Sequence, residues 1–252
     1  MSDQNPYLLN SVGNALSIID LLTKYDELTA QEVAQYMKIG KSTAFRLLST
    51  LANHHFVTKT KDSRYRLSFK LAAIGAVVTD RIELTHIAHP FLQELSRATE
   101  ETSHLVMWAD DTYIQFIDKV LGHSIFRMQS LVGVRLPAHI TATGKVLLAH
   151  ESQEFIQRYI EATSFEPYTP YSITEPQELL KILERVRIDK YGADLDESEE
   201  GLTCYAAPIY NTNGAIMAAI SASGPTERMR RNADSIIKNV KRIAGVISTE
   251  LK

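Results

Sequence analysis

Apolar residues in the first third of the chain recur at helical spacing and predict three helices. The first helix should have Ser11 as its N-cap and carry one apolar stripe, formed by Val12, Ala15, Leu16, Ile19 and Leu22. The second should begin at Thr29, because Thr29 and Glu32 match a capping box, and should end before the Ile39–Gly40 turn. The third should start near Lys41, with its apolar side formed by Ala44, Leu47, Leu48 and Leu51.

The second and third helices, joined by a tight turn, indicate a helix-turn-helix. In this arrangement the start of the second helix of the motif reaches base edges in DNA. Two strand-like runs, residues 56–60 and 64–67, follow around a Lys61–Ser63 turn and predict a wing. The sequence therefore predicts a DNA-binding domain over residues 1–67, with residues 1–9 as a tail.

The rest of the chain mixes helical and strand-like patterns. Residues 68–80 are too apolar for an exposed tether, so residues 68–83 are interpreted as a linker helix that packs against a partner. An amphipathic helix should follow from Leu84. Strands are then expected at 104–108, 113–120, 125–131, 204–210 and 215–223, and helices at 144–150, 154–161, 177–189 and 229–251. Asn213-Gly214 between two apolar runs is a strong hairpin signal. Residues 84–252 are therefore predicted to form an α+β domain.

The distribution of charge supports DNA binding better than the total charge does. The chain of 252 residues has 27 basic and 30 acidic residues, a net charge of −3. The segment from Lys38 to Lys70, however, contains eight Lys and Arg residues but only one acidic residue, Asp62. Phosphate neutralisation needs only such a local patch, so the uneven distribution favours a nucleic-acid surface over a merely solvated basic face.

The composition also limits the cellular setting of the protein. One cysteine, Cys204, excludes an intrachain disulfide framework and fits a reducing cytoplasm. No apolar run approaches the ~20 residues that cross a bilayer, and the start, Met-Ser-Asp-Gln-Asn-Pro, lacks a signal-peptide pattern. We therefore expect a cytoplasmic protein without a membrane partner.

The candidate DNA contacts come from the third helix and the wing. They are Lys41, Ser42, Thr43, Phe45 and Arg46 for the major groove, and Lys59 and Arg64, at the wing tip, for phosphate or the adjacent minor groove. Arg46 is the strongest candidate, because a guanidinium pairs bidentately with guanine. Phe45 offers no hydrogen bond, so it either meets a thymine methyl group or packs within the domain.

Motifs along nearly the whole chain resemble the IclR family of bacterial transcription regulators. In the first domain the matching strings are SVGNAL at 11–16, KSTAFRLL at 41–48 and YRL at 65–67. Beyond it they are ATGKVLLA at 142–149, YGAD at 191–194, EEGLTC at 199–204, API at 207–209 and SASGP at 221–225. The family commonly has tyrosine where this chain has Phe45, so a phenol contact to phosphate would be missing.

The resemblance implies an N-terminal all-α winged helix-turn-helix domain and a C-terminal α+β, GAF-like effector-binding domain. It also implies a linker helix that contributes to dimerisation, and a homodimer or dimer of dimers on an operator with inverted-repeat symmetry. The resemblance further implies that the family's effector-contact positions correspond to ten residues of this chain, namely Ile125, Met128, Leu136, Ala142, Thr143, Asp194, Leu202, Cys204, Ser221 and Ser223.

The residues themselves give partial support to that effector site. The run from Thr141 to Gly144 leads into a helix, and free N–H groups at a helix N-terminus attract an anion such as a carboxylate. Ser221 and Ser223 are two residues apart, so they share one face of a strand, where they could equally be ordinary polar residues. Asp194 is the one acid of a carboxylate-rich loop expected to turn into the pocket.

Enzyme chemistry is not favoured by the sequence. No histidine lies near Cys204 in the sequence, and the histidines lack a recognised metal-ligand spacing, so no catalytic residue, metal or cofactor is expected. Enzymatic action on a small keto or hydroxy acid, with an accessory DNA-binding module, remains the alternative, and a redox sensor using Cys204 is a weaker one. The favoured function is a transcriptional regulator, a repressor of a catabolic operon, switched by a small organic acid.

Overall fold

The computed structural model describes residues 9–80, 83–125, 127–128 and 130–251. The tail expected over residues 1–9 lies, apart from Leu9, outside the described residues. The chain divides into two compact units, Met1–Arg81 and Ile82–Lys252. Each unit has a core of its own.

The first unit is a helix-turn-helix with a small sheet. Its elements are α1 (Asn10–Lys24), β1 (Leu28–Thr29), α2 (Ala30–Tyr36), α3 (Lys41–Asn53), β2 (Val57–Lys59), β3 (Arg64–Leu67) and α4 (Phe69–Asp80). The antiparallel sheet has the order β1-β3-β2, so the wing gains a third strand that the sequence analysis missed. Thr29 and Glu32 form the predicted capping box at the start of α2.

Of the predicted stripe of α1, Leu22 is buried and Ala15 and Ile19 pack against the core, but Val12 and Leu16 do not. Ile18 and Leu22 are buried in the core of the unit, whereas the side chains of Val12 and Leu16 are 52% and 58% exposed. The N-cap position of α1 is Leu9 and makes no side-chain cap, so the expectation of Ser11 as the cap was wrong. Apolar residues occupy two stripes of this helix, and spacing alone does not tell which stripe faces the core.

The second unit is built on a six-stranded antiparallel sheet with the order β6-β5-β4-β9-β8-β7. The strands are β4 (Thr102–Trp108), β5 (Tyr113–Val120), β6 (Arg135–Pro137), β7 (Gly192–Leu195), β8 (Leu202–Tyr210) and β9 (Ile216–Pro225). The helices are α5 (Glu83–Thr99), the 3-10 turn η1 (Ala138–Ile140), α6 (Ala142–Ala149), α7 (Gln153–Ala162), α8 (Pro176–Asp189), α9 (Thr226–Arg231) and α10 (Ala233–Glu250).

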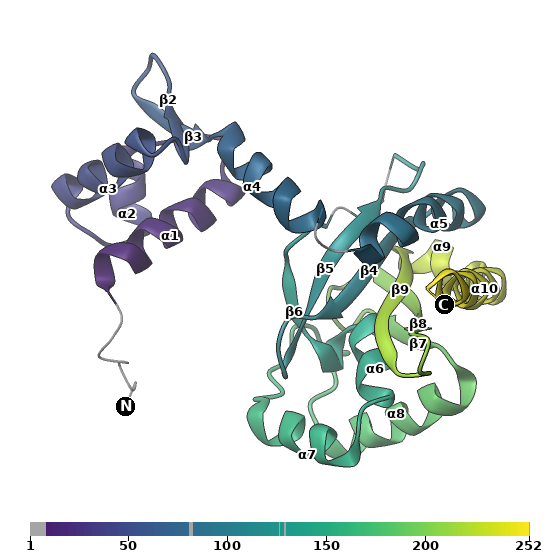
Figure 1. The fold of residues 1–252 in the computed structure, drawn as a ribbon. Coiled ribbons are helices and arrows are strands. Elements are labelled where there is room, and N and C mark those ends of the chain that lie inside the picture. Colours follow the sequence, from purple (N-terminus) through teal and green to yellow (C-terminus); the bar gives the residue numbers. More distant parts are fainter. Residues whose placement is uncertain (1–8, 81–82, 126, 129, 252) are drawn as a thin grey trace. The chain divides into compact units, whose positions relative to one another are not determined.

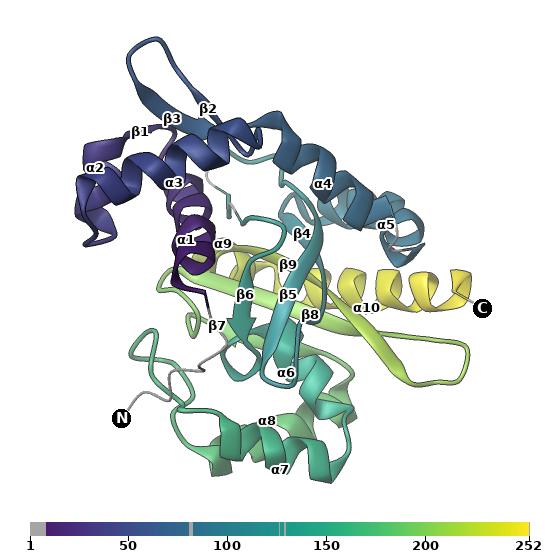
Figure 2. The same ribbon diagram turned by 60° about the vertical axis from the view of Figure 1, so that its left-hand side comes forward.

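Helices cover both faces of this sheet. In Figures 1 and 2, α5 and α10 lie on one side of it, and α6, α7 and α8 lie on the other. Successive residues of a strand point to opposite faces, so Leu105 packs in the core beneath α5 and α10 while Val106 packs in the core beneath α6. Both faces are buried, which explains why the central strands read as continuous apolar runs.

Three local predictions for this unit were wrong. Among the described residues of 125–131 there is no strand, and the partner of β5 is instead the short β6. Strand β7 was missed because it has only four residues. The closing helix predicted from Met229 to Leu251 is two helices, α9 and α10, separated at Asn232.

The architecture otherwise agrees with the predicted fold class, a winged helix-turn-helix followed by an α+β domain. The first domain is not purely helical, because its three short strands form a sheet. Within the described residues, no helix is both long and apolar enough to cross a membrane.

Candidate DNA-binding surface and effector cavity

The start of α3 presents the predicted DNA contacts to solvent. Ala44 and Leu48 are fully buried and fix the inner side of the helix. The predicted contacts on its outer side are all exposed, namely Lys41, Ser42, Thr43, Phe45 and Arg46. Phe45 is 52% exposed, so about half of its surface is available to DNA.

The N-terminus of α3 adds a feature that the sequence analysis did not use. Gly40 occupies the N-cap position and offers no side chain to the first backbone N–H groups of the helix, and the first turn contains no acid. Open N–H groups at a helix N-terminus bind phosphate oxygens. The same end of α3 is therefore suited both to base edges and to the DNA backbone.

Arg64 does not lie at the tip of the wing, as had been expected. It starts β3 opposite Thr29 of β1, and its guanidinium lies 3.0 Å from a carboxylate oxygen of Glu27 and 3.3 Å from one of Glu32. Its Nη2 also donates to the Glu27 carbonyl at 3.1 Å. Lys59 and Lys61, by contrast, are exposed, so the wing offers these ammonium groups more freely than it offers Arg64.

Glu32 links the capping box to this ion pair. The backbone and side chain of Thr29 donate hydrogen bonds that lower the pKa of Glu32, and Arg64 acts in the same direction. A depressed carboxyl pKa gives a contribution to stability that is present above the ordinary pKa and is lost as the pH falls through the lowered one. At neutral pH the Thr29–Glu32–Arg64 contact is therefore fully formed.

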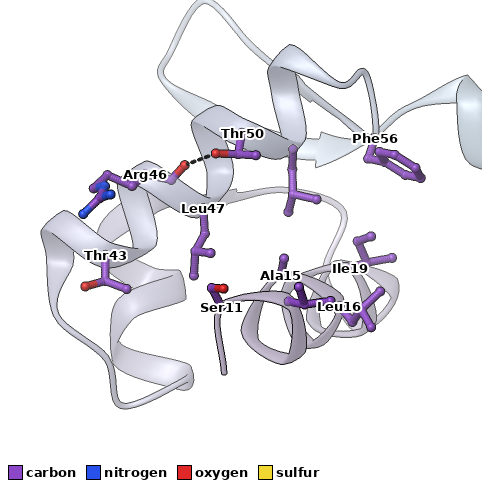
Figure 3. Close-up of a pocket in the computed structure, with 11 residues that line it drawn as sticks. Ser11, Ala15, Leu16, Ile19, Thr43, Arg46, Leu47, Thr50 and Phe56 are labelled. Atoms are coloured by element: carbon purple, nitrogen blue, oxygen red, sulfur yellow. Dashed lines mark hydrogen bonds between the residues drawn. The ribbon is translucent and has the colours of Figure 1, made fainter. Parts of the chain in front are cut away.

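An apolar groove of about 500 Å³ runs between α1 and α3. It is lined by the exposed stripe of α1 together with Leu47, Leu51 and Phe56. In Figure 3, Leu47 points toward α1, whereas the side chain of Arg46 points away from it. Val12 and Leu16, two of the five residues predicted to face the core, therefore line an open groove of the DNA-binding unit.

In the second unit, a small cavity gathers nearly all the predicted effector positions. Met128, Leu136, Ala142, Thr143, Asp194, Leu202, Cys204, Ser221 and Ser223 all line it, and Phe116, Thr141 and Ser198 complete the wall. Ile125 is the exception. Its side chain is fully exposed in the segment after β5, so the expectation that it walls the cavity was wrong. The volume is about 20 Å³, the space of a single water molecule.

The N-terminus of α6 forms one end of this cavity. Thr141 caps the helix by accepting a hydrogen bond from the Gly144 N–H at 3.0 Å. Within the described part of the chain, the N–H groups of Ala142 and Thr143 have no hydrogen-bond partner. A Cβ on Gly144 would lie 2.2 Å from the Ala138 carbonyl oxygen, so only glycine lets α6 approach η1 this closely. These two N–H groups therefore remain free to bind an acceptor.

A buried cluster of charges lies beside the cavity. The Lys145 ammonium is 1% exposed and lies 2.5 Å from a carboxylate oxygen of Glu197. Asp194 accepts from the Glu197 N–H at 2.8 Å and from the Ser198 hydroxyl at 2.6 Å. Burial raises the pKa of Asp194, while Lys145 and these hydrogen bonds oppose the rise. Asp194 therefore holds the turn at 194–198 as well as facing the cavity.

His104 lies beside Ser223, one of the two cavity serines. Cys204 pairs with Ser223 and Ala206 with Ser221 across β8 and β9, so both serines share the cavity face. His104 is fully buried, with Nε2 2.7 Å from the Ser130 hydroxyl and Nδ1 3.4 Å from the Ser223 hydroxyl. Burial, assisted by Lys119, lowers the pKa of His104 to about 3, so the ring is neutral.

Cys204 is a thiol that forms part of the cavity wall. Burial, together with the Asp194 charge, raises the pKa of its thiol well above the ordinary value. Because the thiolate is the nucleophilic form, this environment does not suit catalysis or ready oxidation. In the described ranges, no group of three or more His, Cys, Asp or Glu residues could hold a metal ion.

Two family models match the chain. The model described as the IclR helix-turn-helix domain matches residues 11–61, and the one described as bacterial transcriptional regulator IclR C-terminal matches residues 76–249. The HTH-type transcriptional regulator KdgR of Escherichia coli (strain K12) is 34% identical over 227 residues, covering 90% of this chain and 86% of KdgR. These families and relatives are transcriptional regulators, not enzymes.

Solved structures share the two-unit architecture. IclR of Thermotoga maritima is 30% identical, with a TM-score of 0.76 over 95% of this chain and 99% of that one. An IclR homologue from Microbacterium hydrocarbonoxydans, complexed with 4-hydroxybenzoate, has a TM-score of 0.80 over 96% of this chain and 98% of that one. At 20% identity, the second likeness shows the fold alone.

Proposed function

Because the chain belongs to the IclR family of bacterial transcriptional regulators, we propose that it is a repressor of a catabolic operon, switched by a small organic acid. The observation that carries the effector proposal is the cavity at the start of α6. Two free backbone N–H groups and the hydroxyls of Ser221 and Ser223 line it, beside Asp194 and apolar residues that include Phe116 and Leu202. A carboxylate needs this combination of donors, and the apolar wall suits the rest of a small acid.

The ligand of one structural relative is consistent with this ligand class. The Microbacterium hydrocarbonoxydans homologue is complexed with 4-hydroxybenzoate, a carboxylate. In the present chain the cavity holds only about 20 Å³, so a bound acid must enlarge it. Met128 belongs to the irregular segment after β5, and its carbonyl accepts from Thr102 at 3.0 Å. We infer that this wall opens before the acid enters.

DNA binding is assigned to the exposed start of α3 and to the wing. Lys41, Ser42, Thr43, Phe45 and Arg46 would enter the major groove, and Lys59 would contact phosphate, with Arg64 in a supporting position. A single module this small gives modest specificity. Two modules bound to the two halves of an inverted repeat would supply the remaining specificity. The protein would therefore have to form at least a homodimer.

Exposed apolar surface in the first unit favours such pairing. On α4, Phe69 is 91% exposed, Ile74 44% and Val77 51%. Three large apolar side chains exposed on one short helix support an interaction site. We propose that α4 is the linker helix and contributes to a homodimer or a dimer of dimers in the cytoplasm. An effector that prefers one quaternary arrangement would then change operator affinity by linkage.

The decisive experiment measures binding of the full chain to DNA from upstream of its own gene. Fluorescence anisotropy at fixed salt should give saturable binding that competitor DNA of unrelated sequence does not abolish. A panel of pyruvate-like, sugar and aromatic acids should contain at least one that shifts the DNA affinity. Transcript levels in a deletion strain test repression directly, because expression of the target operon should rise. A fall in expression would make the protein an activator.

A further inference from the structure

The second unit contains another hollow, which shares no residue with the effector cavity. It has a volume of about 750 Å³ and lies where the ends of α6 and α8, the β8–β9 hairpin and one face of α10 meet. Its lining includes His150, Lys190, Tyr210, Lys241, Gly245 and Ser248. We call it the Lys190–Lys241 groove. Pockets that bind small molecules commonly have volumes of about 300–1,000 Å³.

The groove carries positive charge without a compensating acid in its lining. Lys190 and Lys241 both line it, and none of the lining residues is Asp or Glu. The Lys241 ammonium donates to the Asp189 carbonyl at 2.7 Å. The Lys190 ammonium has no hydrogen bond or ion pair with any described residue. Two ammonium groups at one concave surface attract an oxyanion.

The backbone of Lys190 gives a second reason to assign a function to this groove. Lys190 is the C-cap of α8 and has left-handed dihedral angles, φ 58° and ψ 30°. Glycine is the usual residue in this conformation, because a Cβ is strained there. The lysine ammonium makes no hydrogen bond or ion pair with a described residue in return. Strain of this kind, kept without a structural gain, points to a role for the side chain in binding.

His150 and Tyr210 form a hydrogen-bond relay at the side of the groove. His150 Nδ1 lies 2.8 Å from the Val146 carbonyl oxygen, so Nδ1 carries the proton, and Nε2 accepts from the Tyr210 hydroxyl at 2.7 Å. Protonation of Nε2 would reverse the second bond. The Tyr210 hydroxyl would then accept from His150, and its own proton would become available to a ligand.

The charges around His150 suit an anion that arrives in the groove. Burial lowers the pKa of His150, the Val146 carbonyl opposes this, Lys190 and Arg187 lower it further, and Glu151 raises it. Lys241, from α10, adds a second positive charge to the lining of the same groove. Arg187 donates to the carbonyls of Ala149 and Glu151, so the C-terminal end of α6 does not repel an anion.

We propose that the Lys190–Lys241 groove binds a small dianionic metabolite through its phosphate or carboxylate groups. Lys190 and Lys241 supply the charge, and the Tyr210 hydroxyl supplies a directed hydrogen bond. This site goes beyond the effector cavity of the proposed function, and neither depends on the other. Helix α6 starts at the effector cavity with Ala142 and ends at the groove with His150, so a single rigid element reaches both sites.

The test uses the full-length protein and isothermal titration with inorganic phosphate, sulfate and citrate in chloride buffer. The wild-type chain should bind at least one of these probes, and a preference for phosphate or for citrate would identify the anionic group. Lys190→Gly should raise the unfolding temperature, because glycine relieves the left-handed strain, and should weaken binding about tenfold. Sulfate keeps its charge near neutrality, so its affinity should rise as the pH falls and His150 is protonated.

Gly245 provides a matched pair of variants. A Cβ on Gly245 meets no atom within 4 Å, so Gly245→Ala should leave the fold unchanged. Gly245→Leu should fill the groove and abolish binding. Absence of binding by all three probes at millimolar concentration, or unchanged affinity in Lys190→Gly, would overturn the proposal. A change of oligomeric mass in Gly245→Leu, measured by light scattering, would also overturn it, since the groove would then be an interface between copies.

Discussion

Arg64 and Glu32 form an ion pair, with 3.3 Å between Nη2 of Arg64 and a carboxylate oxygen of Glu32. The pair joins the wing to the capping box of α2, because Glu32 also accepts from the Thr29 N–H at 2.7 Å. The wing of this unit is therefore fastened to the helix-turn-helix by a side chain that, from sequence, looked like a DNA contact.

Replacing Arg64 should affect the fold of the first unit more than its contact with DNA. Arg64→Met should lower the unfolding temperature, while the dependence of DNA affinity on salt stays unchanged. The matched variant Lys61→Ala should leave the unfolding temperature unchanged. It should lower the slope of log DNA affinity against log salt concentration by about one, because it removes one phosphate contact. Equal salt slopes in Lys61→Ala and wild type would remove Lys61 from the DNA-binding surface.

Arg46 is expected to carry much of the base-specific recognition. Arg46→Ala should weaken operator binding by about 1–3 kcal/mol per module, the range for one bidentate contact to a base. Its exposure means that unfolding temperature and oligomeric mass should stay the same. Arg185→Ala, an equally exposed substitution in the other unit, serves as the control. Retained operator affinity in Arg46→Ala at fixed salt would contradict the assignment of α3.

The serines of β9 are expected to separate the two activities of the protein. The double variant Ser221→Ala/Ser223→Ala should bind the operator as wild type does but should no longer respond to the effector. Both hydroxyls line the cavity, and neither lies in the DNA-binding unit. Ser235→Ala, on the exposed side of α10, should respond normally. A full effector response in the double variant would place the effector elsewhere.

Asp194 should make effector binding depend on pH. Burial raises the pKa of this carboxyl group, and a bound carboxylate would raise it further, so binding takes up a proton. Effector affinity should therefore increase as the pH falls toward the raised pKa, over the range in which the effector itself stays ionised. Titration calorimetry in buffers of different ionisation enthalpy measures the proton uptake. Asp194→Asn should abolish the pH dependence, and its persistence would assign it to another group.

The Lys145–Glu197 pair should be costly to break from one side only. Lys145 is almost completely buried, so Lys145→Met would leave the Glu197 carboxylate without its partner and lower the free energy of unfolding by about 3–5 kcal/mol. The double variant Lys145→Met/Glu197→Leu should regain most of the lost free energy of unfolding, as measured by denaturant unfolding. The exposed pair Arg242–Glu94 is the comparison, where Arg242→Met should cost at most about 1 kcal/mol.

The sequence predicted best those features that short-range chemistry determines. Thr29 and Glu32 identified the start of α2, and Ala44 and Leu48 the inner side of α3, because capping and helical spacing act within a few residues. The effector cavity came from resemblance rather than from spacing. Its lining comes from α6, β7, β8 and β9, and no local pattern tells that Thr143, Asp194 and Ser223 meet.

The wrong predictions share a physical cause. In each case the local sequence is compatible with two arrangements of similar energy, and contacts distant in the sequence select one of them. On α1 the predicted stripe contains both Leu16 and Leu22, and packing against the rest of the unit buries Leu22 with Ile18 and leaves Leu16 exposed. Residues near Ile125 have a strand-like composition, but the neighbouring edge of β5 is paired by Arg135–Pro137 instead. Arg64 looked free for DNA because the acids that bind it, Glu27 and Glu32, lie more than thirty residues earlier.

The small size of the effector cavity has a kinetic consequence. An organic acid does not fit into about 20 Å³, so it binds only to molecules whose cavity has opened. The observed binding rate should then level off at high effector concentration, at the rate of opening. The measured dissociation constant includes the free energy of opening as well as that of contact. On the proposed function, the response of DNA binding to the acid would be limited by opening of the cavity and not by diffusion of the acid.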